Sequence, residues 1–301
     1  MRIALVALFT FFAAEAEAHA PGVGPEDSWT SLWAAAPLAL AASAYVVGMC
    51  RLWSASGLGR AVHLRRATCF GVAWLSLVVA LLSPLERLST QLFTAHMIEH
   101  EILMVVAAPL LALSHPLAPL LWALPRTVRP AVGQALGSSI LLFPIRRLAM
   151  SPLAATALHA VVLWLWHAPS FYTAALAEQP IHWLQHLSFF CTALLFWWAL
   201  LFGCGRRGYG AAIFYLFATA LQSGFLGILL ALARLPLYPS QGTAAGTWGL
   251  SPLEDQQLAG LIMWVPAGMV YFIAALALAA LWIRGSSAYI PGENRYDLHA
   301  R

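Results

Sequence analysis

Residues 257–283, QLAGLIMWVPAGMVYFIAALALAALWI, form an apolar stretch that no charged side chain interrupts. As a helix rising 1.5 Å per residue, a stretch of this length would extend about 40 Å. The hydrocarbon core of a bilayer is only about 30 Å thick. The stretch therefore predicts a membrane-spanning helix, and the fold class depends on how many others accompany it.

Composition supports the same interpretation for the whole chain. Of its 301 residues, 61% are hydrophobic and 9% are charged, and the mean hydropathy is +0.77, far from the values of soluble domains. Six further apolar segments have roughly spanning length, at 32–52, 67–84, 92–113, 152–168, 183–203 and 210–233. We predict an all-α integral membrane protein, a bundle of seven transmembrane helices, whose environment is the lipid bilayer and not nucleic acid. The segment 114–151 is broken by prolines and arginines, which favours interfacial amphipathic structure.

The arginines predict the orientation. Thirteen of them fall on one side of the predicted spans, at alternate joints and in the tail: Arg51, Arg60, Arg65, Arg66, Arg126, Arg129, Arg146, Arg147, Arg206, Arg207, Arg284, Arg295 and Arg301. The positive-inside rule then places the N-terminus outside and the C-terminal tail, 285–301, in the cytoplasm. Residues 1–18 have the form of a signal peptide, with Ala16-Glu17-Ala18 as the cleavage site. This predicts a membrane domain over 19–284 in a bacterial inner membrane.

Five histidines fall near the predicted outer face. His96 and His100 are four residues apart, as are His182 and His186, and His167 ends its span. Residues four apart share one helix face, with Cβ atoms about 5–6 Å apart. Ionisable side chains within spans are costly and usually functional. The two pairs with His167 therefore predict a metal or haem site.

Other side chains give weaker indications. Asp255, at the outer start of the last span, is a candidate to ligate a metal or to orient a histidine. The remaining candidate ligands are His19, Met104, His159 and Met263. Met97 and Glu99 are expected to lie off the face that His96 and His100 share. Imidazole combined with thioether favours copper, and because only neutral imidazole binds metal, acidification through about pH 6 is expected to release it.

Four segments in this order resemble a known family: TAHMIEHEILMVVAAPLLAL, LWLWHAPSFYTAAL, HWLQHLSFFCTALLFWWAL and LSPLEDQQLAGLIMWVPAG. They look like the polytopic CtaG-type cytochrome c oxidase assembly factors, over about Thr94–Gly268. The resemblance implies a role in maturing a haem-copper oxidase, with copper handling, oxidase subunits as partners and no catalysed reaction. The family's histidines map onto His96, His100, His167, His182 and His186, and its acid before glutamine onto Asp255. Glutamine is commoner in the family where this chain has Glu99.

Three alternatives remain open from the sequence. A copper transporter would need an inward path through positions such as His159 and Gln222. A haem-binding electron-transfer protein would use histidines of neighbouring spans as axial ligands. The third is an intramembrane zinc metallopeptidase, because residues 96–100 spell H-x-x-E-H. The joint 234–256 is long enough to gate a site or to contact the oxidase. The number and oxidation state of copper ions and the oligomeric state are left open.

Overall fold

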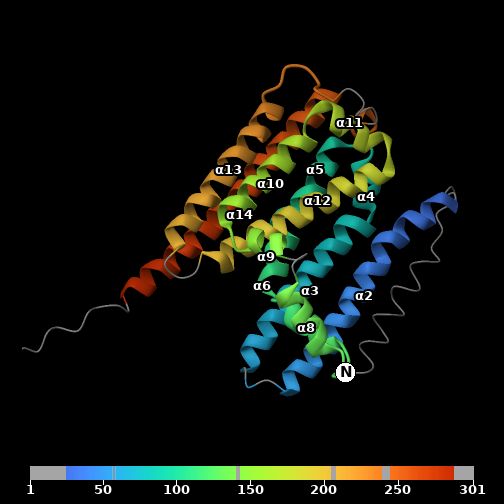
Figure 1. Cartoon of the computed structure of the whole chain (residues 1–301). Helices are drawn as coiled ribbons and strands as arrows, with labels where there is room; N and C mark the ends of the chain where they lie inside the picture. Colours follow the sequence, from blue (N-terminus) through green and yellow to red (C-terminus); the bar gives the residue numbers. More distant parts are fainter. Residues whose placement is uncertain are drawn as a thin grey trace, which may run out of the picture.

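The computed structural model describes residues 25–287, except 56, 58, 140–142, 205–207 and 239–244. Within these ranges every regular element is a helix (Figure 1). The predicted signal peptide, His19 and the tail beyond Ser287 lie outside the described residues. The last helix continues to Ser287, three residues past the predicted end of the membrane domain.

Among the described residues, six helices are long and apolar enough to cross a membrane, which makes the chain a multi-pass membrane protein. They are α2 (Pro25–Ala55, apolar from Ala34), α3 (Arg60–Leu82), α5 (Phe93–Glu101) with η1 (Ile102–Ala107) and α6 (Ala108–Leu113), α12 (Gln179–Trp198) with η2 (Ala199–Gly203), α13 (Tyr209–Ala231) and α14 (Pro252–Ser287). Each corresponds to one predicted span, and the all-helical class is confirmed.

The predicted span 152–168 differs from the other six. It forms α10 (Pro152–Trp166), whose fifteen residues rise only about 22 Å. α10 reaches the length of a membrane span only together with α9 (Phe143–Ala149), and the two helices are bent by 96° relative to each other. Proline begins α10 at Pro152 and α11 (Pro169–Ala177) at Pro169, and this limits α10 at both ends. The described part of the chain therefore has six clear candidate spans, and the seventh remains a prediction.

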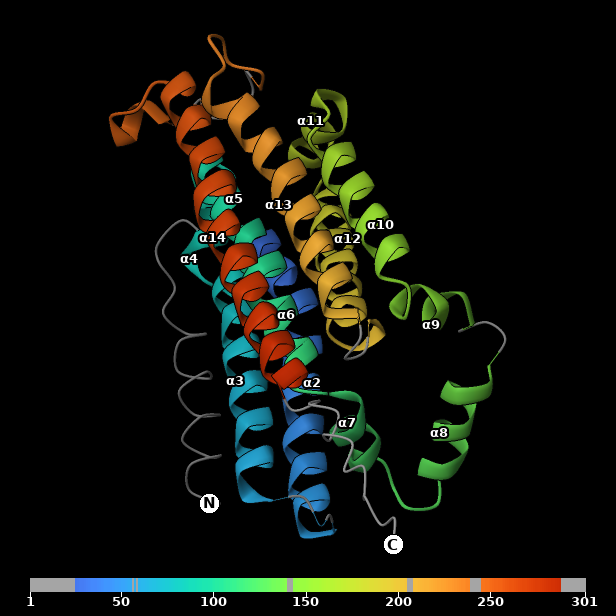
Figure 2. The same ribbon diagram turned by 90° about the vertical axis from the view of Figure 1, so that its left-hand side faces the viewer.

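Short helices replace a span between α6 and α10. They are α7 (Leu117–Ala123), α8 (Arg129–Ser138) and α9, and neither α8 nor α9 buries a side chain. α7 packs closely on α2, because a Cβ on Gly48 would collide with the carbonyl oxygen of Pro119. In Figure 2, α7 and α8 lie toward the lower end of the molecule, which α2 and α3 reach, and α9 lies beside the start of α10.

The opposite end holds the helix termini that carry the predicted ligands. Figures 1 and 2 place α4 (Pro84–Ser89), the start of α5, and α11 there, away from α7 and α8. α5 packs on α14, and α12 packs on η1 and α6. A continuous apolar core joins α5, α12, α13 and α14 beneath this end. The two histidine pairs therefore face each other across a fixed helix contact.

Candidate metal centre

The two predicted histidine pairs meet between α5 and α12. Ring centroids lie 4.3 Å apart for His96 and His100 and 4.2 Å apart for His182 and His186. Between the helices, His96 lies 5.4 Å from His182 and 6.2 Å from His186, and His100 lies 5.1 Å from His186. All four are between 1% and 6% exposed. We call these four residues the histidine cluster.

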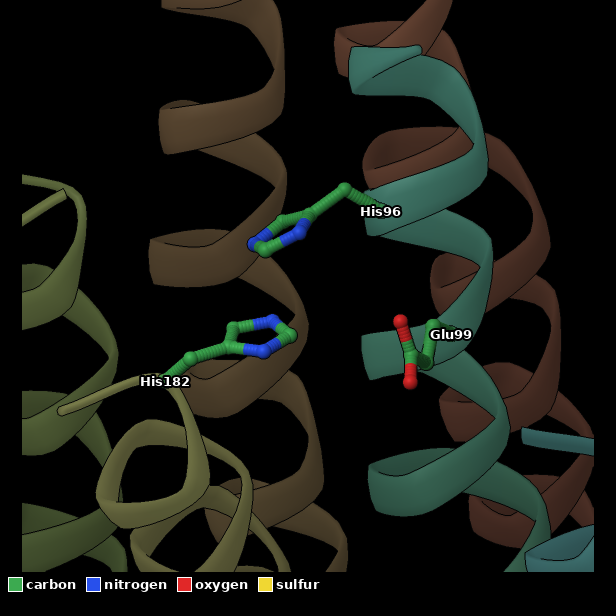
Figure 3. A group of neighbouring side chains, drawn as sticks. All are labelled: His96, Glu99 and His182. Carbon is green, nitrogen blue, oxygen red and sulfur yellow. The ribbon is translucent and has the colours of Figure 1, made fainter. Parts of the chain in front are cut away.

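Glu99 joins the cluster, contrary to the expectation that it lies off the shared face. One ligand atom each from His96, Glu99 and His182 lie within 4.8 Å of one another, and Figure 3 shows His96 and Glu99 projecting from α5 toward His182. The Glu99 Oε1 atom also lies 3.7 Å from Nδ1 of His186. Residues three apart on a helix are neighbours, as are residues four apart. The three-residue spacing of His96 and Glu99 therefore indicates this contact as clearly as the four-residue spacing indicates the histidine pairs.

The cluster is rich in polar atoms without hydrogen bonds. Within the described residues both ring nitrogens of His96 and of His100 lack a partner, as do Nε2 of His182 and of His186. Each such atom, buried without a partner, costs about 1–3 kcal/mol. The carboxylate oxygens of Glu99 also form no hydrogen bond, although Ser89 is its near neighbour. Lone pairs that converge in this way fit a bound cation.

His167 lies beside the cluster and is not part of its ring contacts. Its Nδ1 donates to the carbonyl oxygen of Leu163 at 2.7 Å, which leaves Nε2 as an unpaired acceptor. His167 and His100 pack on the same ring of Phe189, at 6.1 and 4.7 Å between centroids. His167 is close enough to His96 and His100 for their protonated forms to repel one another. Its tautomer is thus fixed with Nε2 free for a ligand.

Three aromatic side chains, Phe93, Tyr172 and Tyr238, cover the cluster, and we call them the aromatic roof. Their ring centroids are 4.3 to 5.2 Å apart, and Tyr172 meets the His96 ring edge-on at 5.3 Å. Tyr238 comes from the joint that follows α13, and its hydroxyl donates to the carbonyl oxygen of His167 at 2.6 Å. Burial raises the pKa of Tyr238 to about 12, so this donor stays protonated at neutral pH. No local sequence pattern indicates that Tyr172 or Tyr238 lies here.

Asp255 holds the helix that carries the first histidine pair. Its Oδ2 accepts from the backbone N–H of Phe93 at 2.7 Å, and its Oδ1 accepts from that of Thr94 at 3.0 Å. The Thr94 hydroxyl donates in turn to the carbonyl oxygen of Asp255 at 3.1 Å. The carboxylate thus caps the N-terminus of α5, where the first backbone N–H groups have no acceptor within the helix. It positions His96 and His100 through their helix and not through a bond to an imidazole.

The weaker candidates among the described residues lie outside the cluster. His159 hydrogen-bonds through Nδ1 to Thr192 Oγ1 at 3.2 Å and stacks on Phe196. The Thr192 hydroxyl donates to the carbonyl oxygen of Ser188 at 2.8 Å, so His159 must supply the proton of its own bond. Met104 and Met263 belong to the apolar core, and His19 is outside the described residues. The structure brings none of the three described candidates, His159, Met104 and Met263, into the cluster.

A cavity of about 260 Å³ opens onto His96 and His182. Its lining comes from Ser89 and Thr90 on one side and from the end of α11 with Gln179 on the other. No charged side chain lines it among the described residues. The cavity gives the cluster a neutral, polar entrance at the end of the bundle.

These features define a class: a polytopic membrane protein with a buried polar site of imidazoles and a carboxylate between two spans. The model of the cytochrome c oxidase caa3 assembly factor family (Caa3_CtaG) matches residues 43–285. The chain belongs to this family, which confirms the resemblance noted from the sequence. The role described for the family is assembly of an oxidase. No curated protein and no solved structure matches the chain.

Proposed function

We propose that this protein holds copper as cargo in the histidine cluster during assembly of cytochrome c oxidase. One observation carries the proposal: four buried imidazoles and the carboxylate of Glu99 converge, and six of the ring nitrogens lack hydrogen bonds. Such a set of neutral and anionic donors in a site of low dielectric binds a cation and excludes a free anion.

The choice of copper follows from ligands and family together. Imidazole suits zinc, copper, iron and nickel alike, and the thioethers of Met104 and Met263 lie in the core. Their expected contribution to copper selectivity is therefore not supported. The family assembles cytochrome c oxidase, a haem-copper enzyme. Copper is thus a metal that this oxidase contains and that imidazole ligands bind.

The geometry suggests an order of contacts for the cargo. His96 and His182 line the entrance, so they would receive the ion first, and His100 and His186 would complete its coordination from below. The charge of Glu99 offsets part of the ionic charge, which reduces the cost of burial. His167 offers Nε2 from the side. An oxidase subunit would collect the ion at the same entrance, which on the predicted topology faces outward from a bacterial inner membrane, as for a copper chaperone.

Two alternatives are less well supported. Copper import needs polar groups that continue inward, but His159 is hydrogen-bonded to Thr192, and the apolar side chains of Met104, Phe196 and Trp197 fill the core at that level. Haem binding needs a larger space, because the 260 Å³ cavity is below the roughly 300–1,000 Å³ of pockets that hold drug-sized ligands.

The position of Glu99 favours a zinc hydrolase as the second candidate. In H-x-x-E-H peptidases two histidines bind zinc and the glutamate activates water. Here Glu99 lies with His96 and His182, close enough to act on a metal-bound water. A substrate peptide would, however, have to reach a site whose rings are at most 6% exposed.

The test is metal content and visible absorption of the full chain purified in detergent, beside His96→Ala/His100→Ala. We expect near-stoichiometric copper in the wild type, its loss in the double variant and no Soret band. His159→Ala is the matched control, because it also removes a buried histidine and lies outside the cluster, so it should retain copper.

Other results would contradict the proposal. A Soret band would assign the site to haem. Zinc alone, with peptidase activity that Glu99→Gln abolishes, would assign it to a hydrolase. Absence of metal from both proteins after copper loading would make the histidines structural.

A further inference from the structure

A second cavity, of about 310 Å³, lies at the end of the bundle opposite the histidine cluster. Three arginines line it together with a tryptophan and small residues, and we call the set the arginine pocket: Arg51, Ser54, Ala55, Trp122, Pro125, Arg126 and Arg129. No acidic side chain is among these residues. The pocket therefore carries three formal positive charges and none of the opposite sign.

Two of the arginines are held in place by the fold. Nη1 of Arg51, on α2, donates to the carbonyl oxygen of Ala123 at 2.7 Å, where α7 ends. Nη2 of Arg129 donates to the carbonyl oxygen of Trp122 at 3.2 Å, and its guanidinium lies 4.1 Å above the Trp122 ring. Each guanidinium has five N–H donors, and these bonds leave the other terminal nitrogen of each without a recorded partner in the described part of the chain.

Arg126 is the third arginine and differs from the other two. It is exposed, and the structure records no hydrogen bond from its guanidinium within the described residues. It lies on the turn between α7 and α8 and lines the same pocket as the two held arginines. A planar, always charged group in this position matches an oxyanion such as phosphate.

The position along the bundle indicates where such an anion would come from. Ala55 ends the apolar part of α2, and Arg60 begins α3, so the pocket lies at the level where two spans leave the hydrocarbon. Exposed apolar residues adjoin its lining residues in the chain, since Trp53, next to Ser54, is 39% exposed and Val128, next to Arg129, is 45% exposed. An anion with apolar chains attached satisfies both surfaces, whereas a free anion uses only the arginines.

We propose that the arginine pocket binds the phosphate of an anionic phospholipid headgroup, with the acyl chains along the exposed apolar side chains beside it. Basic pockets at the cytoplasmic ends of transmembrane helices bind such headgroups in other proteins. The proposal is independent of copper, because no residue is shared with the histidine cluster. Failure of either would leave the other unaffected.

The test measures lipids retained by the full chain in neutral detergent, by native mass spectrometry during titration with phosphatidylglycerol or phosphatidylcholine. We expect preferential retention of phosphatidylglycerol. Arg126→Gln should weaken that binding about five-fold, the effect of one arginine near an anionic headgroup. Because Arg126 makes no recorded hydrogen bond, the melting temperature should not change.

Arg147→Gln is the matched control. Arg147 is an exposed arginine of α9 that does not line the pocket, so this variant loses the same charge and should bind phosphatidylglycerol as the wild type does. Ser54→Trp fills the pocket without changing the charge and should also reduce retention.

Three outcomes would overturn the proposal. Equal retention of the two lipids by the wild type would exclude an anion site. Equal losses in Arg126→Gln and Arg147→Gln would show diffuse attraction and no pocket. Displacement of the lipid by millimolar inorganic phosphate, with thermal protection by phosphate alone, would assign the pocket to a soluble anion.

Discussion

The two ends of the bundle both gather nitrogen-bearing side chains, and burial makes their chemistry opposite. The imidazoles of the histidine cluster are at most 6% exposed, and neutral imidazole offers a lone pair to a cation. The arginines at the other end stay charged and have only donors, so they remain at the surface and attract anions. The comparison shows that depth in the bilayer, as much as residue type, decides which ion a cluster of nitrogen atoms binds.

The largest expected effect comes from neutralising the one carboxylate in the histidine cluster. Glu99→Gln keeps the shape of the side chain and removes the charge that faces His182 and His186. We expect copper affinity to fall about 10- to 100-fold, in the range for groups that support a metal site, measured by competition with a chelator. Glu101→Gln is the control, because Glu101 is also buried but neighbours Tyr271 of α14. Equal losses in both variants would remove the special role of Glu99.

A smaller effect should follow when the support of the cluster changes and its ligands do not. Asp255→Asn leaves one of the N–H groups of Phe93 and Thr94 without an acceptor, since an amide offers a single oxygen. We expect a loss of about 2 kcal/mol in the free energy of unfolding, typical of a buried charged hydrogen bond, seen as a lower melting temperature. Glu254→Gln should have less effect, because Glu254 is exposed and bonds only within its own turn, to Ser251. A melting temperature unchanged by Asp255→Asn would show that α5 does not depend on this cap.

The smallest expected effect is that of salt on copper binding, and it distinguishes the buried end of the molecule from the exposed end. Raising potassium chloride from 0.05 to 0.5 M, a range in which the Debye length falls from above about 10 Å to below about 8 Å, should change copper affinity less than about two-fold. The same change should clearly weaken phosphatidylglycerol binding to the exposed arginine pocket. A strong salt dependence of copper affinity would mean that the cluster is open to solvent.

Much of the fold was predictable, because apolar length alone identifies a span. Six predicted spans were confirmed, and only 152–168 was too long for the helix that Pro152 and Pro169 delimit. The pairing of His96 with His100 and of His182 with His186 followed from helix periodicity. The sequence does not show that the two pairs face each other, because that depends on how α5 and α12 pack.

The misses at the site have a common physical reason. Asp255 caps α5 from a helix 161 to 162 residues further along the chain, and Tyr238 covers the cluster from a joint without regular structure. Both are contacts between distant segments, which no local pattern reports. Glu99 is different, since its three-residue spacing from His96 is a local pattern that places both on neighbouring positions of one helix.

The π-helical turns η1 and η2 affect how the two histidine-bearing helices tolerate the deletion of a residue. Each follows directly after the segment that carries a histidine pair, on α5 and on α12. A π turn holds one residue more than an α turn, so loss of that residue restores an α-helix and leaves the faces before and after it in phase. Loss of a residue from a regular helix such as α13 rotates everything beyond it by about 100°. Single-residue deletions within η1 or η2 should therefore be tolerated where those within α13 are not, which makes the histidine-bearing helices adjustable in length without turning their ligands away.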